Sequence, residues 1–148
     1  MRRLPLLSMV IPPLLIASLV PAGVAPDYSP PPGAYNPAVT PANIGQTVCV
    51  RGWTRMIRPP LSYTAALKRE QIHARRLPGR TSEYQEDHFI PLELGGHPTA
   101  PQNLWPQPLG QAKRKDRWEL GLNRAVCASR MSLADARRKI ADPSLWMK

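Results

Sequence analysis

The sequence predicts a small α+β domain whose central unit is two short strands followed by a helix. The chain has 148 residues, which is enough for one domain with a modest core. Two short extended segments lie between segments whose apolar residues recur at helical spacing. We therefore expect a supporting helix before the central unit and another helix after it, with one disulfide joining the two flanks.

The N-terminal 25 residues have the layout of a secretory signal peptide. Met1-Arg2-Arg3 gives a positive start, residues 4–20 are rich in Leu, Ile, Val and Ala, and small residues follow at Ala22, Gly23 and Ala25. Prolines interrupt the apolar run, so it is a poor transmembrane helix, although an uncleaved membrane anchor is the alternative. The sequence predicts export to the cell envelope or beyond, with removal of 1–25 and no stable membrane association afterwards.

A proline-rich segment follows the leader. Residues 26–42 are expected to form an extended, largely unstructured linker, so that the folded domain spans 43–148. Residues 47–50 are β-prone, and Arg58-Pro59-Pro60 breaks the chain. Ser62 is expected to cap a helix that ends before Pro78-Gly79.

The central unit occupies the middle of the chain. Residues 88–94 are expected to be extended and to end at Gly95-Gly96, and residues 103–105 form a short apolar return. Residues 111–125 have a helical pattern, with Ala112, Trp118 and Leu122 on or near the apolar face. Ser132 is expected to cap the last helix.

The chain has exactly two cysteines, Cys49 and Cys127. In an oxidising compartment two thiols allow a single pairing, so export predicts a disulfide between them. Its long loop would contribute on the order of 4 kcal/mol to stability. Two buried free thiols are the alternative if the chain is not exported.

The charge balance favours a polyanionic partner. The chain has 20 Lys+Arg against 10 Asp+Glu, a formal net charge of +10, which suits nucleic acid, an acidic envelope polymer or a lipid surface. Removal of the leader takes away only Arg2 and Arg3, so the mature chain stays basic. Charge alone does not choose among these partners.

An ordered set of residues in the central unit resembles the HNH nuclease superfamily, whose motif is two short strands and a helix around one metal ion. The set is Glu86-Asp87-His88 continuing to Gly95-Gly96, then Asn103-Leu104-Trp105, then residues 112–116. The flanks are also similar to those of small exported bacterial HNH-like proteins. They include residues 36–40, Val48-Cys49, Gly52-Trp53, Arg58-Pro59-Pro60 and Val126-Cys127.

The resemblance implies roles for three residues. His88 matches the general base, and an imidazole that titrates near neutral pH can take a proton from water. Asp87 matches a ligand of one divalent metal ion, Mg²⁺ or Mn²⁺, and Asn103 matches the residue whose amide holds the imidazole or the loop in place. Adjacent residues on an ideal strand point to opposite faces, so Asp87 and His88 converge only if the strand is twisted or ends there.

The sequence departs from the family pattern on the helix. HNH motifs usually have a His or Asn ligand there, but the matching region, residues 110–113, has none. Asp116 is the only carboxylate in the first helical turns and is therefore the expected second ligand, with Glu119 at i+3. Lys113 and Lys115 are expected to point outward and bind the phosphate that flanks the cut. A solvated helix face is the alternative for both lysines.

Other histidines and tryptophans have simpler interpretations. His97 is expected in a loop and His73 on the surface, whereas Trp105 and Trp118 are expected in the core. The resulting prediction is a metal-dependent endonuclease with little sequence preference. DNA is favoured over RNA as its substrate, but the sequence does not decide between them. The alternative is a non-catalytic exported protein that uses the same scaffold to hold DNA or an acidic polymer, with His88 an ordinary histidine at a sheet edge.

Overall fold

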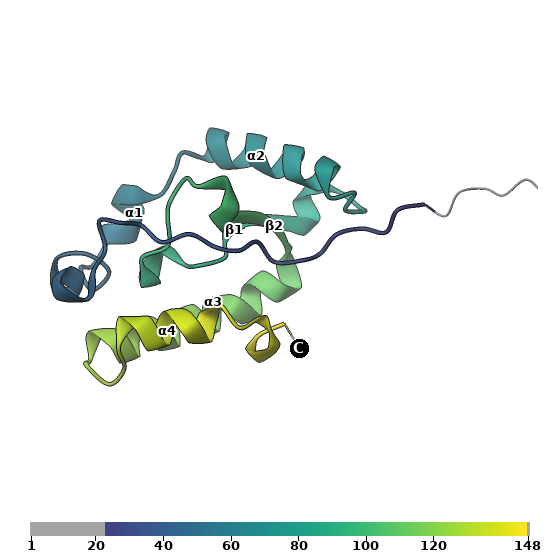
Figure 1. Ribbon diagram of the computed structural model, residues 1–148. Helices are drawn as coiled ribbons and strands as arrows, with labels where there is room; N and C mark the ends of the chain where they lie inside the picture. Colours follow the sequence, from purple (N-terminus) through teal and green to yellow (C-terminus); the bar gives the residue numbers. More distant parts are fainter. Residues whose placement is uncertain (1–22, 148) are drawn as a thin grey trace, which may run out of the picture.

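The computed structural model describes residues 23–147, and the predicted signal peptide lies almost entirely outside this range. The described chain is a mixed α+β domain, as predicted (Figure 1). Within it, every helix is too short or too polar to cross a membrane. Its α-helices and strands are α1 (Trp53–Ile57), α2 (Leu61–Ala74), β1 (Tyr84–His88), β2 (Leu104–Pro108), α3 (Leu109–Cys127) and α4 (Leu133–Ile140). Short 3₁₀ helices span Pro41–Gln46, Thr81–Glu83, Leu92–Leu94, Pro101–Asn103 and Pro143–Leu145.

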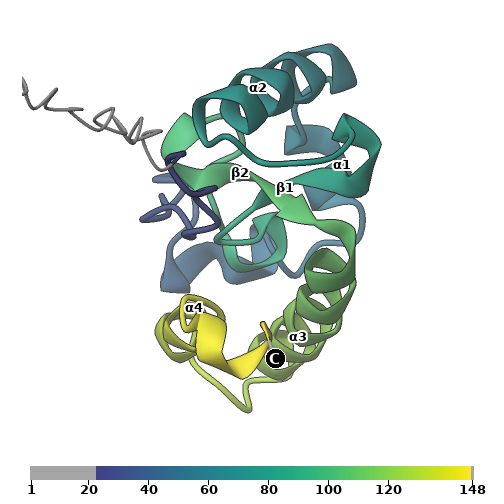
Figure 2. The same cartoon turned by 90° about the vertical axis from the view of Figure 1, so that its right-hand side faces the viewer.

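The two strands form an antiparallel hairpin between two helical layers. Helix α2 packs on one side of the hairpin, and α3 and α4 lie on the other (Figures 1 and 2). The register pairs Asp87 with Trp105 and His88 with Leu104. Because side chains alternate along a strand, Asp87 and Trp105 share one face and His88 and Leu104 share the other.

The first strand begins earlier than predicted. Residues 84–88 form β1, so His88 ends the strand instead of starting it, and residues 92–94 turn into a 3₁₀ helix after Pro91. The prolines Pro106 and Pro108 do not end β2. In a two-stranded sheet every strand is an edge, and an edge strand tolerates a residue that lacks an N–H donor.

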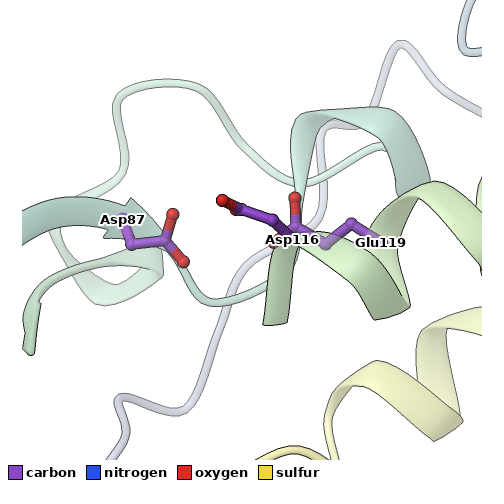
Figure 3. A group of neighbouring side chains, drawn as sticks. All are labelled: Asp87, Asp116 and Glu119. Atoms are coloured by element: carbon purple, nitrogen blue, oxygen red, sulfur yellow. The ribbon is translucent and has the colours of Figure 1, made fainter. Parts of the chain in front are cut away.

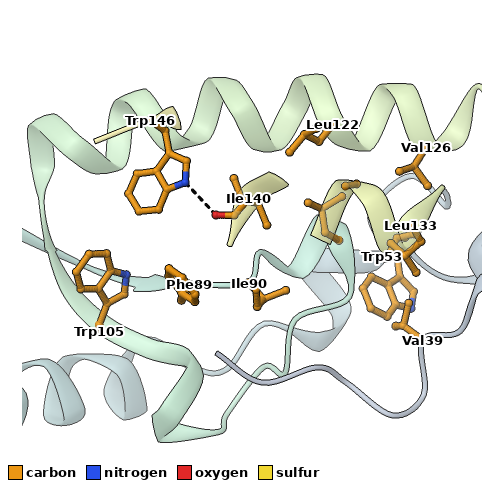
Figure 4. Close-up of a cluster of buried hydrophobic side chains, with 13 residues drawn as sticks. Val39, Trp53, Phe89, Ile90, Trp105, Leu122, Val126, Leu133, Ile140 and Trp146 are labelled. Carbon is orange, nitrogen blue, oxygen red and sulfur yellow. Dashed lines mark hydrogen bonds between the residues drawn. The ribbon is translucent and has the colours of Figure 1, made fainter. Parts of the chain in front are cut away.

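The core lies between the hairpin and helices α3 and α4 (Figure 4). The face of α4 that points inward carries Leu133, Ala136 and Ile140. Trp105 is buried as predicted and meets Phe89 edge to face, with ring centroids 6.4 Å apart. Trp118, which we expected in the core, is instead 37% exposed.

The predicted linker is in part a component of the folded domain. Tyr35 forms a β-bridge with Gly96, the Asn36 N–H donates to the carbonyl of Gly95, and Val39 is buried in the core. The guanidinium of Arg137 stacks over the Tyr35 ring. A proline-rich composition indicates an extended chain, but an extended chain can still pack against a surface that accepts it.

Other details of the helices and turns differ from the prediction. Helix α2 begins at Leu61 with Pro60 at the N-cap position, not Ser62, and residues 47–50 form turns instead of a strand. Helix α1 was not predicted. Ser132 caps α4 as expected, because its side chain accepts a hydrogen bond from the Asp135 N–H.

The predicted disulfide is present. Cys49 and Cys127 are bonded with their Cα atoms 5.5 Å apart and 78 residues apart in sequence. The bond ties the segment before α1 to the C-terminal end of α3. Asn123 reinforces the same junction, since its amide donates to the carbonyls of Val48 and Glu93.

Candidate functional site

Three acidic side chains meet where the hairpin faces α3 (Figure 3). Asp87 reaches from β1, and Asp116 and Glu119 lie one turn apart on α3. One carboxylate oxygen of each lies within 4.8 Å of the other two. The site is assembled locally, because β2 ends at Pro108 and α3 begins at Leu109, so the helix turns straight back across β1.

Lys115 lies inside this acidic group, and the prediction that it points outward is wrong. Its side chain is fully buried, and its Nζ donates to Asp87 Oδ2 at 2.8 Å, to the His88 carbonyl at 2.7 Å, and to Glu119 Oε1. Each ammonium proton therefore has a partner. Lys115 cannot bind substrate phosphate in this position; it holds two of the three carboxylates in place.

The ionisation of the group follows from its burial. Burial favours the neutral amine of Lys115, but the carboxylates of Asp87 and Glu119 outweigh it and raise the pKa of Lys115. Burial raises the pKa of the Glu119 carboxyl, while the ammonium of Lys115 opposes that rise. Burial also raises the pKa of Asp116, the most exposed of the three acids.

His88 is buried at the end of β1, with a fixed ring orientation. Its Nε2 lies 2.9 Å from the carbonyl oxygen of Pro98. A carbonyl oxygen only accepts hydrogen bonds, so Nε2 carries the proton of the neutral ring and Nδ1 carries the lone pair. Burial lowers the pKa of His88, and the positive charges of Arg58 and Lys115 act in the same direction.

Asp87 and His88 meet at one cavity although they leave opposite faces of the strand. A small cavity of about 110 Å³ is lined by both residues together with Asp116 and Glu119. His88 is the last residue of β1, and the chain turns away after it. We expected the two residues to converge only if the strand is twisted or ends at this pair, and β1 ends at His88.

Asn103 holds the loop between the strands. Its amide oxygen accepts from the N–H groups of Ala34 and Ile90, and its amide nitrogen donates to the carbonyls of Ile90 and His97. The side chain is completely buried. Of the two roles expected for this amide, holding the loop is the one that these bonds support.

Arg58 is a cation at the edge of the site that the sequence alone did not indicate. It lines the small cavity and also a larger groove of about 470 Å³ between α2 and β1, and His88 lines both spaces as well. The Arg58 side chain is without a hydrogen bond or ion pair to any residue in the range 23–147. Its position before Pro59 favours an extended backbone that fixes the root of the side chain.

The remaining candidates lie outside the cavity. Lys113 is exposed on α3 and does not line it. As predicted, His73 is exposed and His97 is in the loop. The Nδ1 of His97 accepts from the N–H groups of Thr99 and Ala100.

Comparison with known proteins adds no further constraint on this site. The chain matches no family model, no curated protein and no solved structure.

Proposed function

We propose that this chain is an exported, metal-dependent endonuclease of the HNH type that hydrolyses phosphodiester bonds of DNA with little sequence preference. The observation that carries the proposal is the group of three carboxylates beside a buried histidine whose Nδ1 is left as the basic nitrogen. A β-hairpin that continues directly into a helix supplies all four residues. The Cys49–Cys127 disulfide supports export, because such bonds persist in oxidising compartments.

The donor set suits a hard divalent cation. Carboxylate oxygens are the ligands that Mg²⁺ and Mn²⁺ prefer. Two ligands on opposite sides of one Mg²⁺ lie ~4.2 Å apart, so carboxylates within 4.8 Å of one another need only a small closure to share an ion. Asp87, Asp116 and Glu119 would hold the ion, and Lys115 would orient two of them. When bound, the ion would supply electrostatic stabilisation of the charge that develops on the scissile phosphate.

His88 would act as the general base. Its Nε2–H is engaged by Pro98, so a water molecule at Nδ1 would lose its proton to that nitrogen as it attacks phosphorus. The lowered pKa of His88 keeps the ring neutral at physiological pH, which is the state a base requires. Asn103 would contribute by holding the loop that carries the Pro98 carbonyl.

Two cations would hold the substrate. Arg58 lines the cavity with its guanidinium unpaired within the described chain, so it replaces Lys115 as the expected partner of the scissile phosphate. Lys113, exposed on α3, would contact a phosphate further along the strand. Because charge supplies most of the affinity, binding would weaken steeply as salt is raised.

A second function is favoured by Lys115. Its ammonium already neutralises part of the acidic group, and a neighbouring positive charge disfavours a metal ion. A protein in which Lys115 permanently replaces the metal would be a non-catalytic exported binding protein that holds DNA or an acidic envelope polymer on its basic surface.

A plasmid assay separates the two functions. The oxidised protein is incubated with supercoiled plasmid in Mg²⁺ or Mn²⁺, with and without chelator, and compared with His88→Ala and with the matched control His73→Ala, which changes an exposed histidine. The endonuclease predicts nicking that chelator and His88→Ala abolish and that His73→Ala retains. Cleavage that survives both chelator and His88→Ala would contradict the mechanism, and DNA binding without cleavage would favour the binding protein.

A further inference from the structure

The groove between α2 and β1 is built unlike the acidic cavity beside it. Its α2 wall consists of Leu61, Thr64, Ala65 and Lys68, which lie at positions i, i+3, i+4 and i+7 and therefore form one stripe of the helix. The side chains in the middle of this stripe are small, and that leaves the open space. The volume of about 470 Å³ lies in the range of pockets that bind small organic groups.

The lining of the groove combines two cations with apolar surface on α2. Arg58 and Lys68 are the cations of its lining, and Lys68 uses one of its donors on the Tyr84 carbonyl and keeps the others. Leu61 is 81% exposed, an unusual state for a large apolar side chain. An apolar wall beside cations complements a flat base that is attached to a phosphate.

The groove is continuous with the proposed reaction centre. His88 and Arg58 line both the groove and the acidic cavity. A strand whose scissile phosphate lies at these two residues must place a neighbouring nucleotide somewhere adjacent, and the groove is the adjacent space. The Glu86 carboxyl lines the groove from β1, and within the described chain both of its oxygens are buried without a hydrogen-bond partner.

We propose that the groove between α2 and β1 is a nucleoside subsite, which takes one unpaired base of the nucleic acid strand against Leu61, Thr64 and Ala65 while Lys68 and Arg58 contact the flanking phosphates. This inference rests on the proposed function for the identity of the ligand. It adds that the protein binds the base as well as the backbone, so single-stranded or locally opened DNA is its preferred form. The base enters by its apolar faces, so the subsite has little preference among bases.

The test measures binding by fluorescence anisotropy in the presence of chelator, so that no strand is cut. The probes are a labelled single-stranded DNA oligonucleotide and an abasic oligonucleotide of the same length, which has the same phosphates and no bases. Because the base buries apolar surface against α2, the protein should bind the base-bearing strand on the order of tenfold more tightly. Ala65→Trp, which fills the groove, should bring this ratio close to one, and Ala74→Trp, at an exposed site on the same helix outside the groove, should leave it unchanged.

The outcomes separate this inference from the proposed function. Equal binding of the two strands, or a ratio that Ala65→Trp does not change, would overturn the subsite even if the protein nicks plasmid. A base-dependent ratio that Ala65→Trp abolishes would support the subsite even if no plasmid is cut. If circular dichroism shows Ala65→Trp to be unfolded, the binding ratio is measured for Leu61→Ser instead, which changes an exposed side chain. This variant removes apolar contact area and should lower the ratio about threefold, and an unchanged ratio would overturn the inference.

Discussion

Replacing Lys115 by methionine removes a buried ammonium and leaves its length of hydrocarbon in place. Lys115 is completely buried and bonds Asp87, Glu119 and the His88 carbonyl. Removing one partner of a buried ion pair costs ~3–5 kcal/mol, because the remaining charge is left without compensation. Lys115 has two carboxylate partners, so we expect a loss near the upper end of that range for Lys115→Met.

The loss is measured by urea unfolding of the oxidised protein, with Lys113→Met as the matched control. Lys113 is exposed two residues earlier on the same helix, so its replacement should change the free energy of unfolding by less than about 0.5 kcal/mol. In chelator, a Lys115→Met protein within about 1 kcal/mol of wild type would refute the role of Lys115 as the cation that holds the acidic group.

The same variant also reports on the metal. Without Lys115 the three carboxylates lack a cation, so Mg²⁺ or Mn²⁺ should bind more tightly and restore part of the stability. A metal ion present at a hundred times its Kd stabilises the folded state by ~2.7 kcal/mol. A divalent ion should therefore raise the unfolding midpoint of Lys115→Met more than that of wild type, and an equal rise in both proteins would contradict this expectation.

Three further perturbations test other parts of the structure. Asn103→Ala leaves four backbone groups without their partner and should cost ~2–4 kcal/mol in urea unfolding; a cost below about 1 kcal/mol would show that the loop does not depend on this amide. Replacing Cys49 and Cys127 by serine should cost on the order of 4 kcal/mol, seen as a lower Tm than that of the oxidised protein, and an unchanged Tm would contradict the constraint assigned to the bond. Burial raises the pKa of Glu86 from 4.5 to about 8, so the folded state binds more protons and loses stability as pH rises through that interval. Because Glu86 is partly exposed, solvent screening reduces the free energy that corresponds to this pKa shift. Glu86→Gln should therefore be more stable than wild type by ~2 kcal/mol above pH 8 and equal to it near pH 4. A stability difference independent of pH would refute the raised pKa of Glu86.

A local signal was sufficient for the cap at Ser132, and the count of two cysteines was sufficient for the pairing of Cys49 with Cys127. The order of two strands and a helix was predicted from the resemblance to the HNH superfamily more than from periodicity. Local signals failed for β1, because its Gln85 and Glu86 are polar and mask the alternation that marks a half-buried strand. They also failed for residues 34–39, which have no periodicity and are positioned by contacts with residues far along the chain.

Lys115 was expected on the surface and is buried, whereas Trp118 was expected in the core and is exposed, and both errors have the same cause. Ala112, Lys115, Leu122 and Val126 form the buried stripe of α3, and Trp118 lies at its margin. We assigned lysine to the surface by residue type, although Lys115 follows Ala112 by three positions and precedes Glu119 by four. A lysine in the middle of an apolar stripe, with a carboxylate one turn away, is the pattern that would have indicated a buried ion pair.

The candidate site was anticipated in part. Asp87, His88, Asn103 and Asp116 were selected from the sequence. In the structure, Asp87, His88 and Asp116 line one cavity. Glu119 joins the acidic group because one helical turn separates it from Asp116, a spacing that we noted without assigning it a ligand role. Arg58 is 30 residues before His88 in sequence, and the packing of α2 against the hairpin brings it to the cavity.

We propose that Asp87, Asp116 and Glu119 together bind one catalytic divalent ion. The most direct measurement is the anomalous difference density of Mn²⁺ in crystals of the wild-type protein soaked in that ion. A single peak is expected among these three carboxylates, within about 2.3 Å of an oxygen from each, and this peak should be lost in Asp87→Asn crystals. Absence of a peak there at millimolar Mn²⁺, with Lys115 still bonded to Asp87 and Glu119, would contradict this proposal.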